Sequence, residues 1–134
     1  MTRWGDDHPT RPPRLSERAW QDQVLKLAQL TGWLVHHCRP AMTAGGRYAT
    51  PIQGDAGFPD LVLCRDERVL FVELKTDTGQ VTPDQLRWTA ALAGAAADIR
   101  IWRPRDFDSV RAELTYRPTD LDGPTVDIPT HGRL

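Results

Sequence analysis

The sequence has little of what marks secreted, disulfide-stabilised or membrane-spanning proteins. Its only two cysteines, Cys38 and Cys64, lie in apolar segments without CxxC spacing, and we interpret both as buried thiols rather than as a disulfide or a metal site. No apolar run is long enough to span a bilayer, so we expect no membrane partner. Residues 1–14 contain no apolar signal-peptide core, and we therefore expect an intracellular, cytoplasmic protein.

An excess of charge of either sign is also missing. Seventeen Lys and Arg residues against eighteen Asp and Glu residues give a net charge of -1. A strongly basic nucleic-acid-binding protein is thereby excluded, and any basic surface has to be local. The 134 residues suffice for one hydrophobic core and are too few for two ordinary domains.

The chain divides into one ordered domain and two terminal segments. Residues 1–14 are rich in proline, arginine and polar groups without periodicity, which is typical of a flexible arm. Residues 15–114 carry the periodic patterns of helices and strands and form the predicted domain. The proline-containing residues 115–134 are expected to form a loosely ordered tail.

The first predicted helix has a clear beginning and a clear end. Ser16 is a suitable N-cap, apolar residues recur at helical spacing from Trp20, and Gly32 follows where the helix should stop. Glu17 lies three residues before Trp20 and therefore shares its core-facing stripe. We expect Glu17 to point along the inside of the fold from the first turn.

A run of strands follows this helix. Residues 33–38 form a predicted strand, and residues 39–59, with four glycines, are expected to be a long loop of functional importance. The β-type runs 60–64 and 69–75 flank the polar residues Arg65-Asp66-Glu67-Arg68, a pattern that predicts a hairpin.

The second helix is signalled most clearly. Thr82 is the predicted N-cap, Pro83 fits the first helical position, Gln85 completes a capping box, and Gly94 is the expected stop. Residues 98–102 then read as a strand. The expected apolar face of the second helix consists of Leu86, Ala90 and Ala93, and Phe107, Val110 and Leu114 indicate a last helix.

The order of these elements is helix, three strands, helix, strand, helix. We therefore predict an α/β fold with a mixed central β-sheet flanked by helices. The hairpin supplies antiparallel neighbours, and the later crossover through a helix supplies a parallel pair.

The hairpin brings two acidic residues together. If Asp66 and Glu67 close a two-residue turn, Asp60 lies opposite Glu73, with Cβ atoms about 4.5 to 5.5 Å apart. A four-residue loop keeps this register, whereas a three-residue loop with a bulge shifts it by one residue. Two carboxylates so placed repel each other, so we expect a cation between them.

Lys75 lies two residues beyond Glu73, and strand alternation places it on the same face as both acids. Carboxylate oxygens select Mg²⁺ or Mn²⁺ over zinc, and such an ion commonly takes further ligands from phosphate oxygens. Two acids and a lysine at a strand end therefore point to phosphodiester hydrolysis.

The combination of these motifs resembles the VRR-NUC group of the PD-(D/E)xK nucleases, which occurs in phage proteins and in the Fanconi-anaemia-associated nuclease. The resemblance covers residues 16–104. It is carried by Ser16-Glu17 with Gln21, Gly32-Trp33, Gly57-Phe58-Pro59-Asp60, Glu73-Leu74-Lys75 and Thr82-Pro83-Asp84-Gln85.

The resemblance implies a restriction-endonuclease-like fold with one catalytic centre. It implies that Asp60, Glu73 and the Leu74 backbone carbonyl bind Mg²⁺ or Mn²⁺, and that Lys75 assists the attacking water. It also implies that Glu17 from the first helix and Gln85 from the second reach the site. The catalytic set is then Glu17, Asp60, Glu73, Lys75 and Gln85.

The implied function is that of a DNA endonuclease. Phage-type relatives resemble Holliday junction resolvases and form homodimers, which makes branched DNA the leading substrate and a homodimer the expected assembly. Two alternatives stay open at this point: a nuclease for flaps or DNA ends, and a non-catalytic DNA-binding module with the same fold.

Other residues suggest chemistry less directly. His36 and His37 are adjacent, so in a strand they face opposite sides and cannot chelate one ion together. Trp88 is compatible with either packing or base stacking. Arg39, Arg47 and Arg65 flank the expected cleft, where each could bind phosphate or simply be solvated, and Trp20, Trp33 and Trp102 fall at core-facing positions.

Overall fold

The structure is a computed structural model of the whole chain, and it describes residues 14–38, 41–42, 48–49 and 53–118. Residues 1–13 of the predicted N-terminal arm and residues 119–134 of the predicted C-terminal tail lie outside the described residues. Within the described part, no helix is both long enough and apolar enough to cross a membrane.

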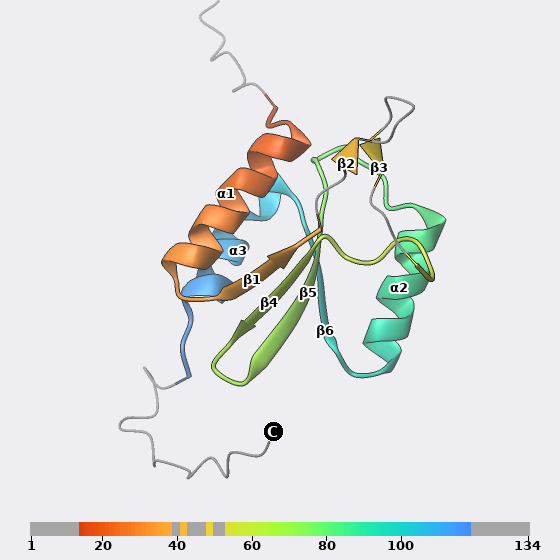
Figure 1. Ribbon diagram of the computed structural model, residues 1–134. Helices are drawn as coiled ribbons and strands as arrows, with labels where there is room; N and C mark the ends of the chain where they lie inside the picture. The colour runs from red at the N-terminus through yellow and green to blue at the C-terminus, as the bar shows by residue number, and fades with distance from the viewer. Residues whose placement is uncertain (1–13, 39–40, 43–47, 50–52, 119–134) are drawn as a thin grey trace, which may run out of the picture.

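A four-stranded mixed sheet forms the centre of the domain (Figure 1). Its strands are β1 (Leu34–His37), β4 (Leu61–Arg65), β5 (Arg68–Leu74) and β6 (Asp98–Trp102), in the order β1-β4-β5-β6. β1 and β5 both run antiparallel to β4, and β6 runs parallel to β5. The predicted mixed sheet, with a hairpin and one parallel crossover pair, is confirmed.

The hairpin between β4 and β5 has the predicted register. Asp66 and Glu67 both adopt positive φ angles, 49° and 66°, as a type I′ turn requires at its two central residues. Arg65 pairs with Arg68, and the ladder continues to the pair of Leu61 with Val72. No bulge shifts the strands between these two pairs.

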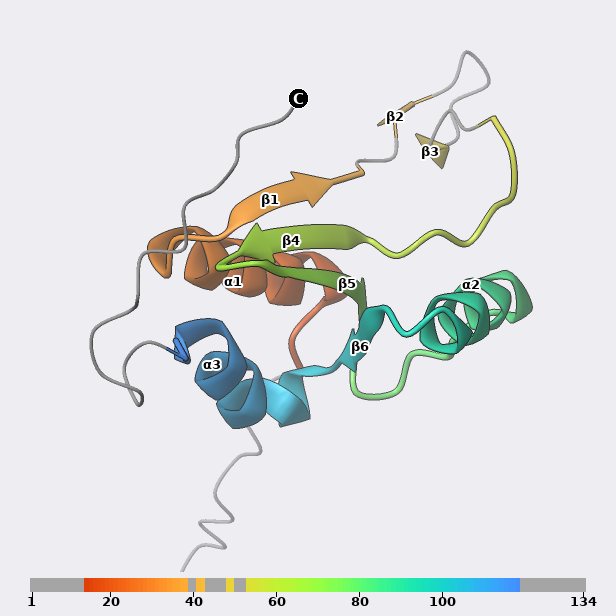
Figure 2. The same cartoon turned by 90° about the horizontal axis from the view of Figure 1, so that it is seen from below.

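The helices cover the two faces of the sheet unequally (Figure 2). Helices α1 (Glu17–Leu30) and α3 (Phe107–Thr115) lie on one face, and the short 3₁₀ helix η1 (Pro104–Asp106) leads into α3. Helix α2 (Pro83–Gly94) lies on the other face, beside β6. Among the described residues, no helix covers the rest of that second face.

The hydrophobic core lies between the sheet and the α1–α3 layer. Two indoles also donate hydrogen bonds there, from Trp20 Nε1 to the Trp102 carbonyl and from Trp33 Nε1 to the Leu114 carbonyl, each 3.0 Å. The prediction that Trp20, Trp33 and Trp102 are core residues is confirmed. The core consists of Trp20, Val24, Ala28, Trp33, Leu61, Leu63, Leu70, Val72, Leu74, Trp102, Val110 and Leu114.

Both long helices begin as predicted, and one of them ends differently. The Ser16 hydroxyl accepts a hydrogen bond from the Ala19 N–H, and Gly32 follows α1 with a φ of 88°. Thr82 and Gln85 form the predicted capping box of α2. Gly94 is still helical, and the left-handed residue after α2 is Ala96, with a φ of 59°.

The face that α2 turns toward the sheet was predicted wrongly. Leu86 is 53% exposed, and Ala90 and Ala93 are exposed as well. The partly buried residues of α2 are instead Gln85, Trp88, Thr89 and Leu92. The indole of Trp88 packs edge-on against Phe58, a partner from a loop far away in sequence, and this contact sets the rotation of the helix.

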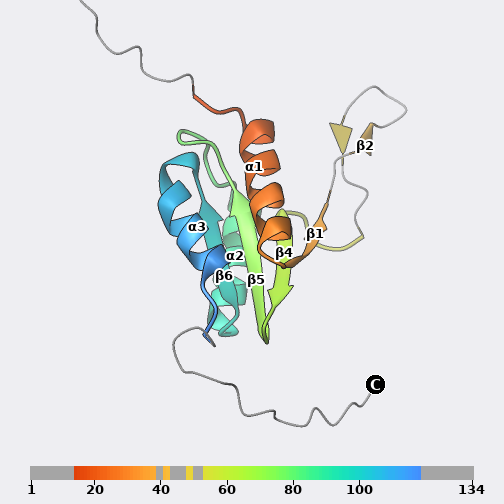
Figure 3. The ribbon, with the colours of Figure 1, turned by 90° about the vertical axis from the view of Figure 1, so that its left-hand side faces the viewer.

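The segment 39–59 was predicted to be a loop without regular structure, and this too needs correction. Strands β2 (Ala41–Met42) and β3 (Tyr48–Ala49) pair antiparallel in a small separate sheet, which stands away from the main sheet (Figure 3). Strands of two residues are too short to produce an alternating apolar pattern, so the sequence did not reveal them.

The two cysteines are free, and the interpretation of both as buried thiols is wrong. Cys64 is exposed and Cys38 is only partly buried. Cys64 alternates with the buried Leu63 along β4 and thus lies on the face that α2 leaves uncovered.

Candidate functional site

The predicted site residues gather at one edge of the sheet. Because β4 and β5 are antiparallel, the start of β4 and the end of β5 lie side by side at this edge. Helices α1 and α2 also begin at this end of the sheet (Figure 1). Four elements that are distant in sequence therefore bring their ends to one place.

Asp60 lies directly before β4, and its carboxylate is held against the end of β5. Its Oδ2 accepts a hydrogen bond of 2.8 Å from the Leu74 N–H. Continuing the hairpin register by one residue beyond the pair of Leu61 with Val72 places Asp60 opposite Glu73. The expected juxtaposition of the two acids is thus present.

Glu73 is a nearly completely buried acid, with 2% of its surface exposed. Burial, a side-chain hydrogen bond with Asp60 and the negative charge of Asp60 raise the pKa of Glu73 to about 9, against a small opposing effect of Lys75. Without a cation, Glu73 therefore carries a proton at neutral pH.

Gln85 connects the first turn of α2 to Glu73. Its Oε1 accepts a hydrogen bond of 2.9 Å from the Thr82 N–H, and its Nε2 donates one of 2.9 Å to Glu73 Oε1. Both ends of the amide are therefore engaged, and the capping of the helix also orients the buried acid.

Lys75 and Glu17 lie at the periphery of this group. Lys75 is anchored by its backbone N–H, which donates to the Trp102 carbonyl at 3.1 Å. Its positive charge lowers the pKa of Glu73, and the negative charge of Glu17 raises it. The structure thus brings Asp60, Glu73 and Gln85 into direct contact and places Lys75 and Glu17 close enough to affect Glu73 electrostatically. The expectation that Glu17 shares the core-facing stripe of α1 is wrong, because Glu17 is exposed and burial along this stripe begins one turn later, at Trp20.

Gly57 was noted only as part of a motif, but it positions the segment that leads into Asp60. It adopts a φ of 94°, and a Cβ at this position would lie 2.4 Å from the backbone carbon of Asp84 in α2. Phe58, next in the chain, packs on Trp88, whose Nε1 donates to the Asp55 carbonyl at 3.3 Å. This assigns Trp88 a packing role in place of the base stacking left open above.

Neither alternative left open for Arg65, phosphate binding or solvation beside the cleft, is correct, because Arg65 is buried at the hairpin turn, at the opposite end of β4 from Asp60. It is 8% exposed, lies 4.5 Å from the centre of the Trp33 ring, and donates hydrogen bonds of 2.7 Å to the Thr31 and Leu114 carbonyls. Arg65 therefore ties the ends of α1 and α3 together. Arg39 and Arg47 lie outside the described residues.

The two histidines lie at consecutive positions of β1, opposite Val62 and Leu61. As predicted, strand alternation turns them to opposite faces. His36 Nε2 lies 3.5 Å from Cys38 Sγ.

The donor set at the site fits a hard divalent cation. No group of three or more His, Cys, Asp or Glu side chains in the described part of the chain is arranged to hold a metal. The predicted set, however, comprises only two carboxylates and the Leu74 backbone carbonyl. A buried carboxyl that holds a proton against a neighbouring carboxylate marks a position where a cation would relieve the repulsion between the two acids.

Comparisons with known proteins agree with this geometry. The family model of the VRR-NUC domain matches residues 19–105. A solved structure described as a VRR_NUC domain superposes with a TM-score of 0.53 at 22% identity, over 75% of this chain and 97% of that chain, and so shares the fold. The search of curated proteins found no match.

Proposed function

Because the chain belongs to the VRR-NUC domain family, part of the PD-(D/E)xK nuclease superfamily, we propose that it is a divalent-metal-dependent DNA endonuclease. The observation that carries this proposal is the buried Glu73, held between Asp60 and Gln85 where β5 ends. A purely structural domain has no need of a buried acid beside a second, partly buried one, because this arrangement destabilises the folded state unless a ligand compensates it.

Mg²⁺ or Mn²⁺ would be held by Asp60, by Glu73 and by the Leu74 backbone carbonyl. When bound, such an ion polarises a phosphoryl oxygen and acidifies water. The Leu74 N–H keeps the Asp60 carboxylate in place, and Gln85 does the same for Glu73, so the ligands are positioned before the ion arrives.

The remaining chemistry falls to the residues around the acid pair. Lys75 forms no ion pair within the described residues, so its ammonium group is available to orient the attacking water and to offset the charge that develops on the phosphate. Glu17 at the start of α1 lies at the same end of the sheet, close enough to affect Glu73 electrostatically, and would help to hold water there.

We propose branched DNA such as a Holliday junction as the substrate and a homodimer as the active form, because incision of opposite strands needs two centres related by a two-fold axis. We place this activity in the cytoplasm, that of the host cell if a phage encodes the protein. Cleavage of flaps or DNA ends is the competing outcome. The intact set of Asp60, Glu73 and Lys75 argues against a non-catalytic binding module.

The test is cleavage of plasmid, duplex, fork, flap and four-way-junction DNA with Mg²⁺, with Mn²⁺ and with EDTA. We expect Asp60→Asn and Glu73→Gln to reduce cleavage by at least about 100-fold with the fold retained, because each removes a charged ligand at unchanged size. Glu67→Gln at the exposed hairpin turn is the matched control and should cleave normally.

Near-normal cleavage by either site variant would refute the proposed centre. Cleavage of flaps in preference to junctions would retain the centre and replace the proposed substrate.

A further inference from the structure

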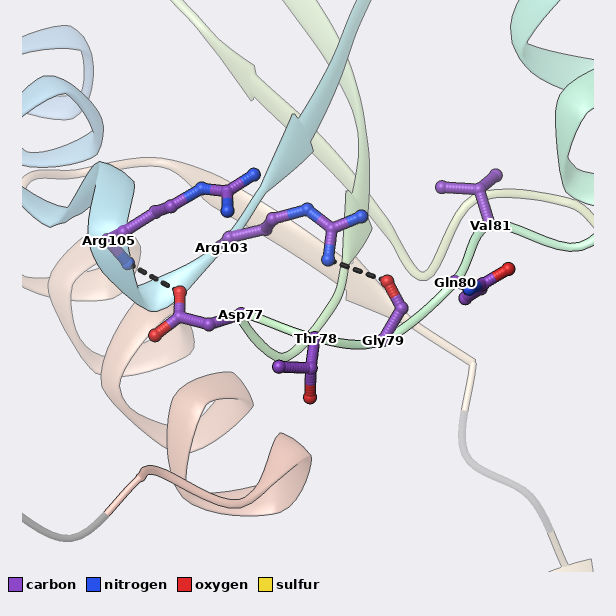
Figure 4. Close-up of a pocket in the computed structure, with 7 residues that line it drawn as sticks. All are labelled: Asp77, Thr78, Gly79, Gln80, Val81, Arg103 and Arg105. Carbon is purple, nitrogen blue, oxygen red and sulfur yellow. Dashed lines mark hydrogen bonds between the residues drawn. The ribbon is translucent and has the colours of Figure 1, made fainter.

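A shallow depression of about 360 Å³ lies beside the candidate active site, between the turn that follows β5 and the start of η1 (Figure 4). Two arginine side chains, Arg103 and Arg105, extend along it in the same direction. The turn begins directly after Lys75, and a Cβ on its Gly79 would lie 3.7 Å from Lys75 Cδ, so the depression lies beside the lysine of the proposed catalytic centre. Its lining consists of Asp77, Thr78, Gly79, Gln80, Val81, Arg103 and Arg105.

Arg103 holds the turn in place and has further N–H donors that are not engaged by the described residues. Its Nη1 donates hydrogen bonds of 2.6 Å to both the Thr76 and the Gly79 carbonyls. A guanidinium group has five N–H donors in a rigid fork, and these two bonds use only the hydrogens on Nη1. No described residue accepts from its Nε or Nη2, so one side of the fork is fixed in position with donors available for a ligand.

Neither guanidinium group is paired with a carboxylate of the described residues. Asp106 accepts at 3.0 Å from the backbone N–H of Arg103, not from its side chain. The one acid in the lining, Asp77, accepts at 3.0 Å from the backbone N–H of Arg105 rather than from a guanidinium group. By contrast, an ion pair is formed by each of Arg65, Arg68, Arg87, Arg100, Arg111 and Arg117.

We propose that Arg103 and Arg105 bind a backbone phosphate of the DNA, beside the phosphodiester group at the catalytic centre. This inference rests on the proposed function and adds the residues that position its substrate. Guanidinium groups match phosphate oxygens in a bidentate geometry, and the rigid turn supports one of the two. A local pair of this kind also explains how a chain with a net charge of -1 can bind a polyanion.

The test measures binding of a fluorescent four-way junction and of duplex DNA by the full chain, over a series of salt concentrations. All proteins carry Glu73→Gln to prevent cleavage. We expect Arg105→Ala to weaken binding by about five- to tenfold at 0.1 M salt and to reduce the slope of log K against log salt by about 1. Arg105→Lys should retain that slope, because it retains the charge.

Arg111→Ala is the matched control, since Arg111 is an exposed arginine of α3 outside the depression, and it should bind as the parent protein does. Arg103→Ala is expected to weaken binding further, with thermal unfolding measured alongside because it also releases the turn.

Equal affinities for Arg105→Ala and Arg111→Ala would overturn the inference whether or not Arg103→Ala folds. The proposed function fails on a different result, which is the absence of metal-dependent cleavage by the unsubstituted chain.

Discussion

At the scale of single residues, Glu73 is a position that lowers the stability of the folded state. Its carboxyl group is buried, and the charge with the largest effect on its pKa is that of a second carboxylate, Asp60. Gln85 supplies one hydrogen bond, which satisfies the acid without neutralising it. The folded chain therefore holds a proton on Glu73 that the unfolded chain releases near pH 4.5.

This linkage predicts that the metal-free protein loses stability as the pH rises. The pKa of Glu73 is about 9 in the folded state and near 4.5 in the unfolded state, so the folded state binds more protons between these values. The stabilisation of the folded state by the proton on Glu73 is complete below about pH 4.5 and is lost as the pH rises through about 9. Urea unfolding in EDTA should give a free energy of unfolding that declines over this range.

Glu73→Gln should flatten this decline, because the amide cannot ionise, whereas the exposed Glu67→Gln should follow the unsubstituted chain. A decline that is equally steep in Glu73→Gln would show that other groups cause it.

At the scale of elements, the site depends on how α2 is seated against the segment that leads into β4. Gly57 touches the first turn of α2 at Asp84, and Phe58 packs between Phe71 of β5 and Trp88 of α2. One short segment thus determines where Asp60 lies before β4 and where Gln85 meets Glu73. The two halves of the site are positioned by the same contact.

Gly57→Ala adds only a methyl group, but we therefore expect it to lower both stability and cleavage. A Cβ would lie 2.4 Å from a backbone atom of Asp84, so the segment or the helix must move. Gly54→Ala is the matched control, because Gly54 also has a positive φ, 113°, but its Cβ would meet nothing within 4 Å.

Both substitutions should lose about 1–3 kcal/mol of stability from backbone strain. Gly57→Ala should lose about 1–2 kcal/mol more and should also lose metal-dependent cleavage, as measured by urea unfolding and the plasmid assay. Equal behaviour of the two variants would contradict the seating of α2 through Gly57.

At the scale of the whole molecule, the two faces of the sheet differ. Helices α1 and α3 bury one face completely enough to form the core, and α2 shields the other face only beside β6. Apolar side chains remain exposed on the uncovered part, among them Leu34 at 76% and Val69 at 44%. A domain of this size offers one active centre at one edge of its sheet.

Cutting both strands of a junction with such a domain requires a second copy. We therefore predict that static light scattering at micromolar concentration gives twice the 15.1 kDa of the chain. Addition of a four-way junction should leave two chains per DNA molecule. A single chain, both free and on the junction, would exclude paired incision and favour cleavage of flaps or ends.

The sequence by itself did not reveal the short strands β2 and β3, but it determined the helices, apart from the end of α2, the strands of the main sheet and the register that joins the acids. Local signals suffice for these, since the caps of α1 and α2 and the hairpin turn each act within a few residues. Once Arg65 pairs with Arg68, the register of the hairpin places Asp60 opposite Glu73. Side-chain alternation along the strand then directs Val72 and Leu74 to the core.

The tertiary structure alone decided which face of α2 is buried, that Cys64 is exposed, and that Arg65 ties helix ends together rather than facing the site. Each depends on a partner distant in the chain: Phe58 for Trp88 of α2, the uncovered sheet face for Cys64, and the Leu114 carbonyl for Arg65. Periodicity identifies residues that share a face but does not identify what lies against that face. The unengaged N–H donors of Arg103 could not be predicted from the sequence either, because only the folded turn shows which of its N–H groups already donate hydrogen bonds.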